Sequence, residues 1–304
     1  MIQNKKIQQF IIRSILFLST ILVSIFFIFL QVDGYTDDFY IKFTTPKQNS
    51  LILGTSRASQ GLQPTVLKEI LDKEIFNYAF TAASSPFGTT YLNSIKRKTT
   101  TNDGVFIITI DPWSISSTTK NPNDSNNFRE TTSFLARTSL VNANPNLEYL
   151  FESFNGNYSK LFKKDTSIFL HNDGWLEVSV DMSHNAVKKR TDEKVNSYLD
   201  IFTRYHYSEV RLQSLDKTID YLKQYGNVYL IRLPIHPKMM VIENELMPDF
   251  EAKISLTKTK CTGYLDLTPY NSDYSYTDGN HIHKNSGKLV SQKIANWIQL
   301  FEKK

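Results

Sequence analysis

A serine near one end of this sequence and an aspartate and a histidine near the other could together make a nucleophile. Ser56 lies two places after Gly54, which ends the short apolar run 51–53. Asp278 and His281 lie three residues apart in a turn-rich segment before the last helical pattern. An aspartate at this spacing can hold the imidazole Nδ1–H, which leaves Nε2 free to take the serine proton. The residue types therefore predict a Ser-His-Asp triad in the chain order Ser, Asp, His.

The elements that must position these groups alternate between strand and helix patterns. Strands separated by helices predict a parallel sheet covered on both faces, and ligands bind at the C-terminal edge of such a sheet. We therefore expect a three-layer α/β/α sandwich with Ser56 at that edge. The predicted strands are 51–53, 75–78, 105–110, 228–233 and 264–267, and the predicted helices are 64–73, 88–98, 208–224 and 286–301.

The block Gly54-Thr55-Ser56-Arg57, with Asp278-x-x-His281 near the end of the chain, resembles the SGNH/GDSL hydrolase superfamily. The resemblance covers about residues 48–117 and 227–303. It implies a flavodoxin-like α/β fold and action on esters, including O-acetyl groups of carbohydrates. It also implies Ser56 as nucleophile, His281 as base and Asp278 as the group that orients the base. The Gly-Thr-Ser-Arg variant behind an N-terminal anchor is more similar to membrane-tethered members associated with cell-surface polymer acylation.

Two blocks that supply the oxyanion hole in that superfamily are altered here. The region after the second strand has no glycine until Gly88, and the third strand is followed by Asp111 instead of the usual Gly-x-Asn-Asp block. Backbone N–H groups of Ser56 and of a residue near Ala83 are the remaining predicted donors. Loss of one donor costs about 100- to 1000-fold in kcat. The alternative is therefore a weak or inactive SGNH-like protein that binds or helps to assemble a surface polysaccharide.

Three further residues are predicted to contact substrate. Arg57 could hold a carboxylate or phosphate, although pairing with a nearby acid is an equal alternative. Ala83 belongs to the candidate oxyanion segment, and His236 follows the fourth strand, where it would face the same crevice or pack structurally. His283 is a rival base, but the three-residue spacing from Asp278 favours the nearer histidine. No metal site and no organic cofactor are predicted.

The N-terminal part predicts a membrane helix. Residues 14–30 form an uncharged run of 17 residues, long enough to cross a bilayer core of about 30 Å. A cleaved signal peptide is the main alternative, but 31–35 offers no small-x-small cleavage site. Basic residues precede the run and acidic ones follow it, which predicts a cytoplasmic N-terminus, a single pass through the cytoplasmic membrane and an extracytoplasmic domain.

The predicted organisation is a cytoplasmic tail (1–13), a transmembrane helix (14–30), a linker (31–47) and one SGNH hydrolase-like domain (48–304). An insertion at about 114–206 departs from a minimal fold and is predicted to form a cap or partner surface. Within it we expect a polar loop at 116–127, an amphipathic helix at 146–162 and a hairpin tip at 171–178.

Composition excludes several other classes of function. Lys5, Lys6 and Arg13 supply three of the +5 net charges, which leaves +2 for residues 14–304 and no argument for nucleic acid. Cys261 is the single cysteine, which excludes an intrachain disulfide and a cysteine-based zinc cage. The leading hypothesis is a membrane-anchored serine esterase or O-acyltransferase. Its predicted partners are an acylated carbohydrate or cell-envelope polymer, the lipid bilayer and a membrane-bound acyltransferase.

Overall fold

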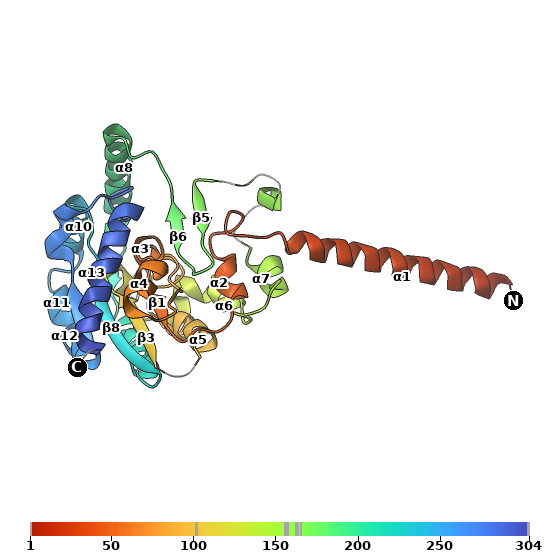
Figure 1. Ribbon diagram of the computed structural model, residues 1–304, viewed down its shortest axis with the longest axis horizontal. Helices are drawn as coiled ribbons and strands as arrows, with labels where there is room; N and C mark the ends of the chain where they lie inside the picture. Colours follow the sequence, from red (N-terminus) through yellow and green to blue (C-terminus); the bar gives the residue numbers. More distant parts are fainter. Residues whose placement is uncertain (1, 101–102, 155–157, 162–163, 165, 303–304) are drawn as a thin grey trace.

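A parallel sheet of five strands forms the centre of the domain, in the order β2-β1-β3-β8-β9 (Figure 1). The protein is described by a computed structural model for residues 2–100, 103–154, 158–161, 164 and 166–302. The strands are β1 (Leu51–Leu53), β2 (Phe76–Asn77), β3 (Gly104–Thr109), β8 (Gly226–Arg232) and β9 (Gly263–Asp266). All five predicted strands are present, each within two residues of its expected ends, which is the usual uncertainty of strand and helix boundaries.

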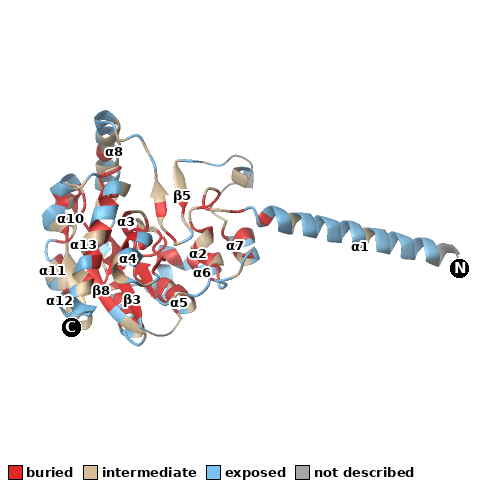
Figure 2. Cartoon of the chain, viewed as in Figure 1, coloured by how far each residue is buried: buried red, intermediate tan, exposed pale blue. Residues whose placement is uncertain are grey.

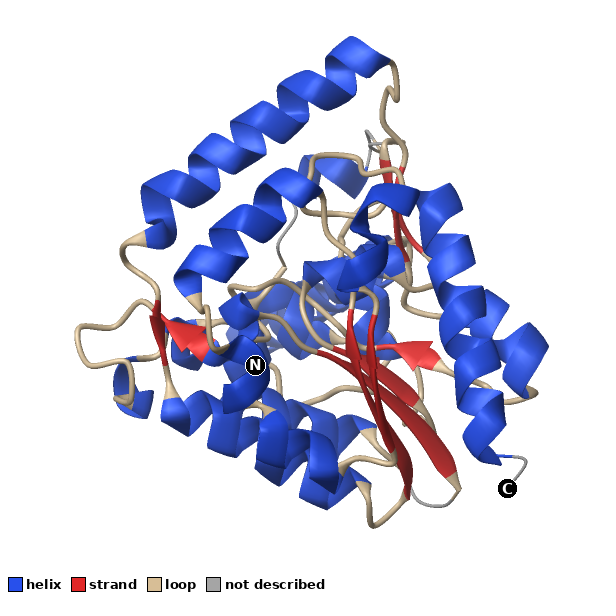
Figure 3. Cartoon of the chain, turned by 90° about the vertical axis from the view of Figure 1, so that its left-hand side faces the viewer, coloured by secondary structure: helices blue, strands red, loops and turns tan. Residues whose placement is uncertain are grey.

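Helices cover both faces of this sheet, as Figure 3 shows. Successive strand residues point to opposite faces, and the register aligns Ile52 with Ile107 and Ile107 with Tyr229 on one of them. The α/β sandwich expected from the sequence is therefore present. The helices of the domain are α2 (Tyr40–Thr44), α3 (Ser56–Gly61), α4 (Pro64–Leu71), α5 (Thr89–Lys98), α6 (Phe134–Arg137), α7 (Leu147–Glu152), α8 (His184–Phe202), α9 (Glu209–Leu222), α10 (Pro237–Leu246), α11 (Phe250–Lys253), α12 (Ser255–Lys260) and α13 (Lys284–Glu302).

Each face has its own apolar core. On the face that holds Ile52, α4 and α13 contribute the buried side chains Leu67, Val290 and Ile294. On the opposite face, α5 and α9 pack Ile95 and Ile219 against the other side of the strands. Figure 2 shows the resulting band of buried residues between the helices. Burial on both faces explains why the strands consist of continuous apolar runs rather than an alternating pattern.

The insertion differs from the sequence prediction in three places. The helix expected at 146–162 ends at Glu152, and a separate short turn follows at Tyr158–Leu161, with 155–157 and 162 outside the described residues. The hairpin is confirmed as an antiparallel pair, β5 (Ile168–Leu170) and β6 (Leu176–Val178). The expected loop at 116–127 instead begins with a strand, β4 (Ser116–Ser117), which pairs with β7 (His206–Tyr207). The 19-residue helix α8 was not predicted, because Thr191 is its one buried residue.

One apolar helix, α1 (Ile2–Phe29), extends away from the domain (Figure 1). Within its segment Lys5–Phe29, the apolar window of 18 residues has a mean hydropathy of 2.4 and no buried residue, which suits a membrane span and equally a signal sequence. Figure 2 colours most of its residues as exposed and its end at the domain as buried. The helix includes nearly all of the predicted tail 1–13, because the lysines and glutamines there are good helix formers.

The predicted linker 31–47 is wrong as a spacer. It contains α2, whose Tyr40 and Phe43 are buried in the domain core and pack against Tyr149 of α7. Aromatic side chains bury large apolar areas, so this segment is part of the folded domain. The polypeptide therefore passes from α1 into the domain core with a short connection.

Candidate active site

Ser56 lies at the C-terminal edge of the sheet, where the chain passes from β1 into α3. The strand ends at Leu53, Gly54 turns the backbone with φ +141°, and Ser56 is the first residue of α3. This positive φ is rarely adopted by residues with a side chain. Gly54 is therefore the residue that lets the chain turn sharply enough to present the serine.

We expect Gly54→Ala to lower the free energy of unfolding by about 1–3 kcal/mol from backbone strain alone. The added Cβ would also lie 1.9 Å from Thr109 Oγ1. Gly61→Ala is the matched control, since its Cβ would meet Ile282 Cδ1 at an ordinary 3.5 Å. Thermal unfolding of both variants checks this prediction, and equal melting temperatures would contradict it.

Asp278 and His281 lie on a tight turn just before α13. A bridge between Tyr276 and Ile282 closes the turn, and the N–H of Thr277 donates to the His281 carbonyl at 2.9 Å. The Asp278 carboxylate accepts the backbone N–H groups of Asn280 and His281, each at 3.0 Å. The turn is thus fixed by the same carboxylate that faces the imidazole.

The three predicted catalytic side chains meet in one chain of hydrogen bonds. His281 Nε2 lies 2.9 Å from Ser56 Oγ. On the other side of the ring, Nδ1 lies 3.0 Å from both carboxylate oxygens of Asp278. An ionised carboxylate only accepts, so Nδ1 carries the hydrogen and the Nε2 lone pair faces the serine hydroxyl. This is the geometry that a serine nucleophile and its base require.

The surroundings of Asp278 keep its carboxylate ionised. Burial raises its pKa, but the hydrogen bond and charge of His281, followed by the charge of Lys194, lower it more, so the pKa lies well below the ordinary 3.8. Lys194 of α8 places Nζ 3.1 Å from Asp278 Oδ2. The helix from the insertion therefore contributes directly to the electrostatics of the triad.

We expect Lys194→Met to raise the pKa of Asp278 and to lower the melting temperature above about pH 4. A carboxylate whose pKa is lower in the folded state stabilises the fold at pH values above its pKa in the unfolded chain. This stabilisation is lost as the pH falls through the pKa of the folded state. The difference from wild type should therefore disappear at the most acidic pH. Lys194 is 31% exposed, so the effect should be about 1 kcal/mol or less. Thermal unfolding against pH checks this, with Lys188→Met as the exposed control on the same helix; a difference that persists in acid would contradict it.

A cleft of about 270 Å³ opens beside Ser56 and His281. Trp113 in its wall packs edge-on against Tyr198 and Tyr205, with ring centroids 4.8 and 5.1 Å apart. The residues that line the cleft come from both ends of the domain and from the insertion. They are Ser56, Thr81, Ala82, Ala83, Trp113, Arg129, Lys194, Tyr198, Ile201, Tyr205, Asn280 and His281. Among the described residues no group of three or more His, Cys, Asp or Glu side chains could hold a metal ion.

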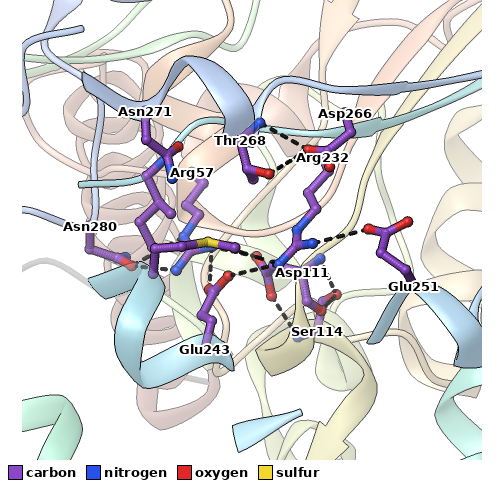
Figure 4. Close-up of polar contacts among 12 residues, drawn as sticks. Arg57, Asp111, Ser114, Arg232, Glu243, Glu251, Asp266, Thr268, Asn271 and Asn280 are labelled. Carbon is purple, nitrogen blue, oxygen red and sulfur yellow. Dashed lines mark hydrogen bonds and ion pairs between the residues drawn. The ribbon is translucent and has the colours of Figure 1, made fainter. Parts of the chain in front are cut away.

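Arg57 does not line this cleft, which corrects its predicted contact with substrate. Its side chain is 5% exposed, and its NH1 pairs with Glu243 at 2.6 Å and with Asp111 at 3.6 Å. Nε and NH2 donate to Asn280 Oδ1 at 3.1 and 2.8 Å (Figure 4). A guanidinium committed on all sides in this way has no free face for a ligand.

The acids around Arg57 belong to a larger buried network, drawn in Figure 4. Glu243 of α10 also lies 3.8 Å from Arg232, which pairs with Glu251 at 3.0 Å. Asp111 caps the turn after β3 by accepting the Ser114 N–H at 2.8 Å. These contacts make Asp111 a structural residue.

The other predicted residues separate into two groups. Ala83 lines the cleft with the triad, as expected for a residue near the oxyanion position. His236 does not: its Nδ1 accepts the Lys238 N–H at 3.1 Å as the cap of α10, and its ring lines a different hollow. Pro234 and Pro237 lie on either side of it, in the segment that connects the strand to that helix.

The rival base His283 lies two residues after His281. Its backbone N–H donates to the Ser275 carbonyl, and burial lowers the pKa of its imidazole.

Several lining residues of the cleft were not predicted from the sequence, among them Lys194 and Tyr198 of α8 and one further polar residue. A stripe of Val187, Thr191, Val195 and Tyr198 at helical spacing was the signal available for that helix. The third is Asn280, which lies inside the Asp-x-x-His block itself. Its contact with Arg57 joins residues 223 positions apart, so no local pattern could indicate it.

No protein-family model and no curated protein matches this chain. Among solved structures it is similar to an aryl esterase of M. Smegmatis in an inhibitor-bound form. The match is 12% identical, has a TM-score of 0.36, and covers 83% of this chain and 98% of the esterase. At this degree of similarity it assigns neither a family nor an activity.

Proposed function

We propose that this protein is a membrane-anchored serine esterase or O-acyltransferase of the SGNH type. The observation that carries the proposal is the unbroken contact from Ser56 Oγ through His281 to Asp278, at 2.9 and 3.0 Å. The cleft beside Ser56 gives an ester access to the hydroxyl. These groups are sufficient for acyl transfer through a covalent intermediate.

The proposed reaction has two halves. Nε2 of His281 takes the proton of Ser56 as Oγ forms a bond to the acyl carbon, and the charged imidazole is stabilised by Asp278. The C–O bond to the leaving alcohol breaks, and that alcohol receives the proton from Nε2. Water or a sugar hydroxyl then gives its proton to Nε2 and attacks the acyl group, and the bond to Oγ breaks as Ser56 regains its proton.

The substrate that we propose is an O-acylated carbohydrate or cell-envelope polymer. Tyr198 and Tyr205, which pack against the buried Trp113, line the cleft and are aromatic surfaces against which sugar rings can pack. The apolar helix α1 would hold the domain at a membrane surface, on the extracytoplasmic side by the charge pattern. A membrane-bound acyltransferase is then a suitable acyl donor in the transfer reaction.

The second candidate function is a non-catalytic polymer-binding or assembly protein. The feature that favours it is Asp111, which follows β3 where the resemblance expects an oxyanion asparagine. Its carboxylate pairs with Arg57 and Ser114. The two functions differ in one respect that can be measured, namely turnover of an ester.

The test uses the full chain purified in detergent. It is incubated with an O-acetylated oligosaccharide, and separately with para-nitrophenyl acetate and a free sugar, while acetate and O-acetyl sugar are quantified. We expect acetate or an acetylated sugar to form in proportion to enzyme concentration, and the ratio of the two products separates hydrolysis from transfer. Release no faster than with heat-inactivated protein, together with retained binding of the oligosaccharide, would support the binding function instead.

A further inference from the structure

Asn280 is a buried amide in the wall of the active-site cleft with one end fixed and the other end facing the reacting groups. Its side chain is 3% exposed and lines the same cleft as Ser56 and His281. Nδ2 lies 3.3 Å from His281 Nε2, the atom that contacts Ser56 Oγ at 2.9 Å. A hydrogen-bond donor is thus held beside the two atoms that exchange the proton.

The orientation of this amide is determined by Arg57. Nε and Nη2 of the guanidinium both donate to Asn280 Oδ1, at 3.1 and 2.8 Å. A guanidinium has only donors, so an amide turned the other way would place its own N–H donors against the N–H groups of Arg57. Glu243 and Asp111 hold the guanidinium from its other side, as Figure 4 shows. The NH2 group of Asn280 is therefore directed to the triad.

The partner of Nδ2 changes during the proposed reaction. In the resting triad the single lone pair of His281 Nε2 accepts from Ser56, and Nδ2 makes a longer contact to the same atom. Once Nε2 has taken the serine proton it is a donor and can no longer accept from Asn280. The amide N–H then lacks an acceptor in the step in which the carbonyl oxygen becomes an anion.

We propose that Asn280 Nδ2 donates a hydrogen bond to the oxyanion, in place of the asparagine that the chain lacks after β3. This inference rests on the proposed function. Arg57 acts as a positioning residue, and Asp111 occupies the position of the missing asparagine but serves to hold Arg57. A preorganised donor of this kind stabilises the transition state more than the bound ester, because the charge develops only there.

The test compares Asn280→Ala and Asn280→Asp with wild type in hydrolysis of para-nitrophenyl acetate by the full chain in detergent. We expect kcat to fall about 100- to 1000-fold in both variants, with KM nearly unchanged. Asn280→Asp keeps the acceptor for Arg57, so it should retain the wild-type melting temperature. If the alanine variant does not fold, the kcat of Asn280→Asp alone tests the oxyanion role. Asn285→Ala, an exposed asparagine in the first turn of α13, is the matched control and should retain full activity.

The pH profile of Asn280→Ala separates an oxyanion donor from a residue that only tunes the base. An oxyanion donor lowers kcat at every pH and leaves the acidic limb in place, whereas tuning of His281 moves that limb. A shifted limb with recovered kcat at its plateau would overturn the inference, as would a kcat within about threefold of wild type in an active enzyme. If the wild-type protein shows no turnover that depends on Ser56, the proposed function itself fails, which comparison of wild type with Ser56→Ala reveals before any Asn280 variant is made.

Discussion

Ser56→Ala should lower kcat for an acetyl ester by about 10,000-fold or more, which is the size of effect seen when the nucleophile of a triad is removed. Ser56 is part-buried, and the change deletes only the hydroxyl that contacts His281. The melting temperature should therefore stay close to that of wild type. Steady-state hydrolysis of para-nitrophenyl acetate and thermal unfolding of both proteins check this result.

Ser197→Ala is the matched control for the nucleophile. This exposed serine of α8 lines a hollow next to Asp278. In the part of the chain that the structure describes, it makes no hydrogen bond to the His281 imidazole. It should retain full activity. Equal turnover by the wild-type and Ser56→Ala proteins would show that ester cleavage proceeds at another site.

Asp278→Asn should lower kcat at about pH 7 by about 10,000-fold, nearly as much as loss of the nucleophile. The asparagine amide can donate to Nδ1, which favours the ring tautomer with its hydrogen on Nε2. That tautomer has no lone pair toward Ser56 and cannot act as a base. The exposed Asp273→Asn change in the preceding turn is the control and should have little effect.

The pKa of Asp278 also predicts part of the pH profile of the wild-type enzyme. His281 and Lys194 lower this pKa well below the ordinary value of 3.8, against the effect of burial. The carboxylate is therefore ionised throughout the range from about pH 4 upward, where histidine titrates. We expect kcat/KM to fall with a single protonation on the acidic side; a second step that Asp278→Asn removes would contradict this account.

The central sheet and the pairing of Ser56 with Asp278 and His281 could be predicted because their signals are local. Each strand is a short apolar run, and the spacing of three residues between Asp278 and His281 lies within one turn. Parallel strands bring their C-terminal ends to one edge, so two motifs that are distant in the sequence are expected to meet there. The contact between Ser56 Oγ and His281 Nε2 agrees with this expectation.

For Arg57 and His236 the sequence left a substrate contact and a structural role open, because the choice depends on contacts made by other elements. The partners that bury Arg57 come from α10, from the turn after β3 and from the turn that holds His281. His236 follows the strand expected to carry it, yet the helix α10 takes its ring away from Ser56. Position at a strand end limits where a side chain starts, but tertiary packing decides which way it faces.

The helix α8 was missed for a different reason. Its sequence is charged and mostly solvent-exposed, so it lacks the broad apolar stripe that identifies a helix in the core. It nevertheless supplies Lys194 to the triad and Tyr198 to the cleft. A helix with a single buried residue gives little apolar periodicity, which makes it hard to recognise from sequence.

The most direct test of the account is covalent labelling of the full-length protein with a fluorophosphonate, followed by mass spectrometry of the labelled peptide. Fluorophosphonates react with serines that a neighbouring base activates. We predict a single phosphonylated residue, Ser56, and a labelling rate that falls by about 100-fold or more in His281→Gln, because general-base assistance is lost. Labelling at another residue, or equal labelling of Ser56 in wild type and His281→Gln, would contradict the claim that His281 activates Ser56.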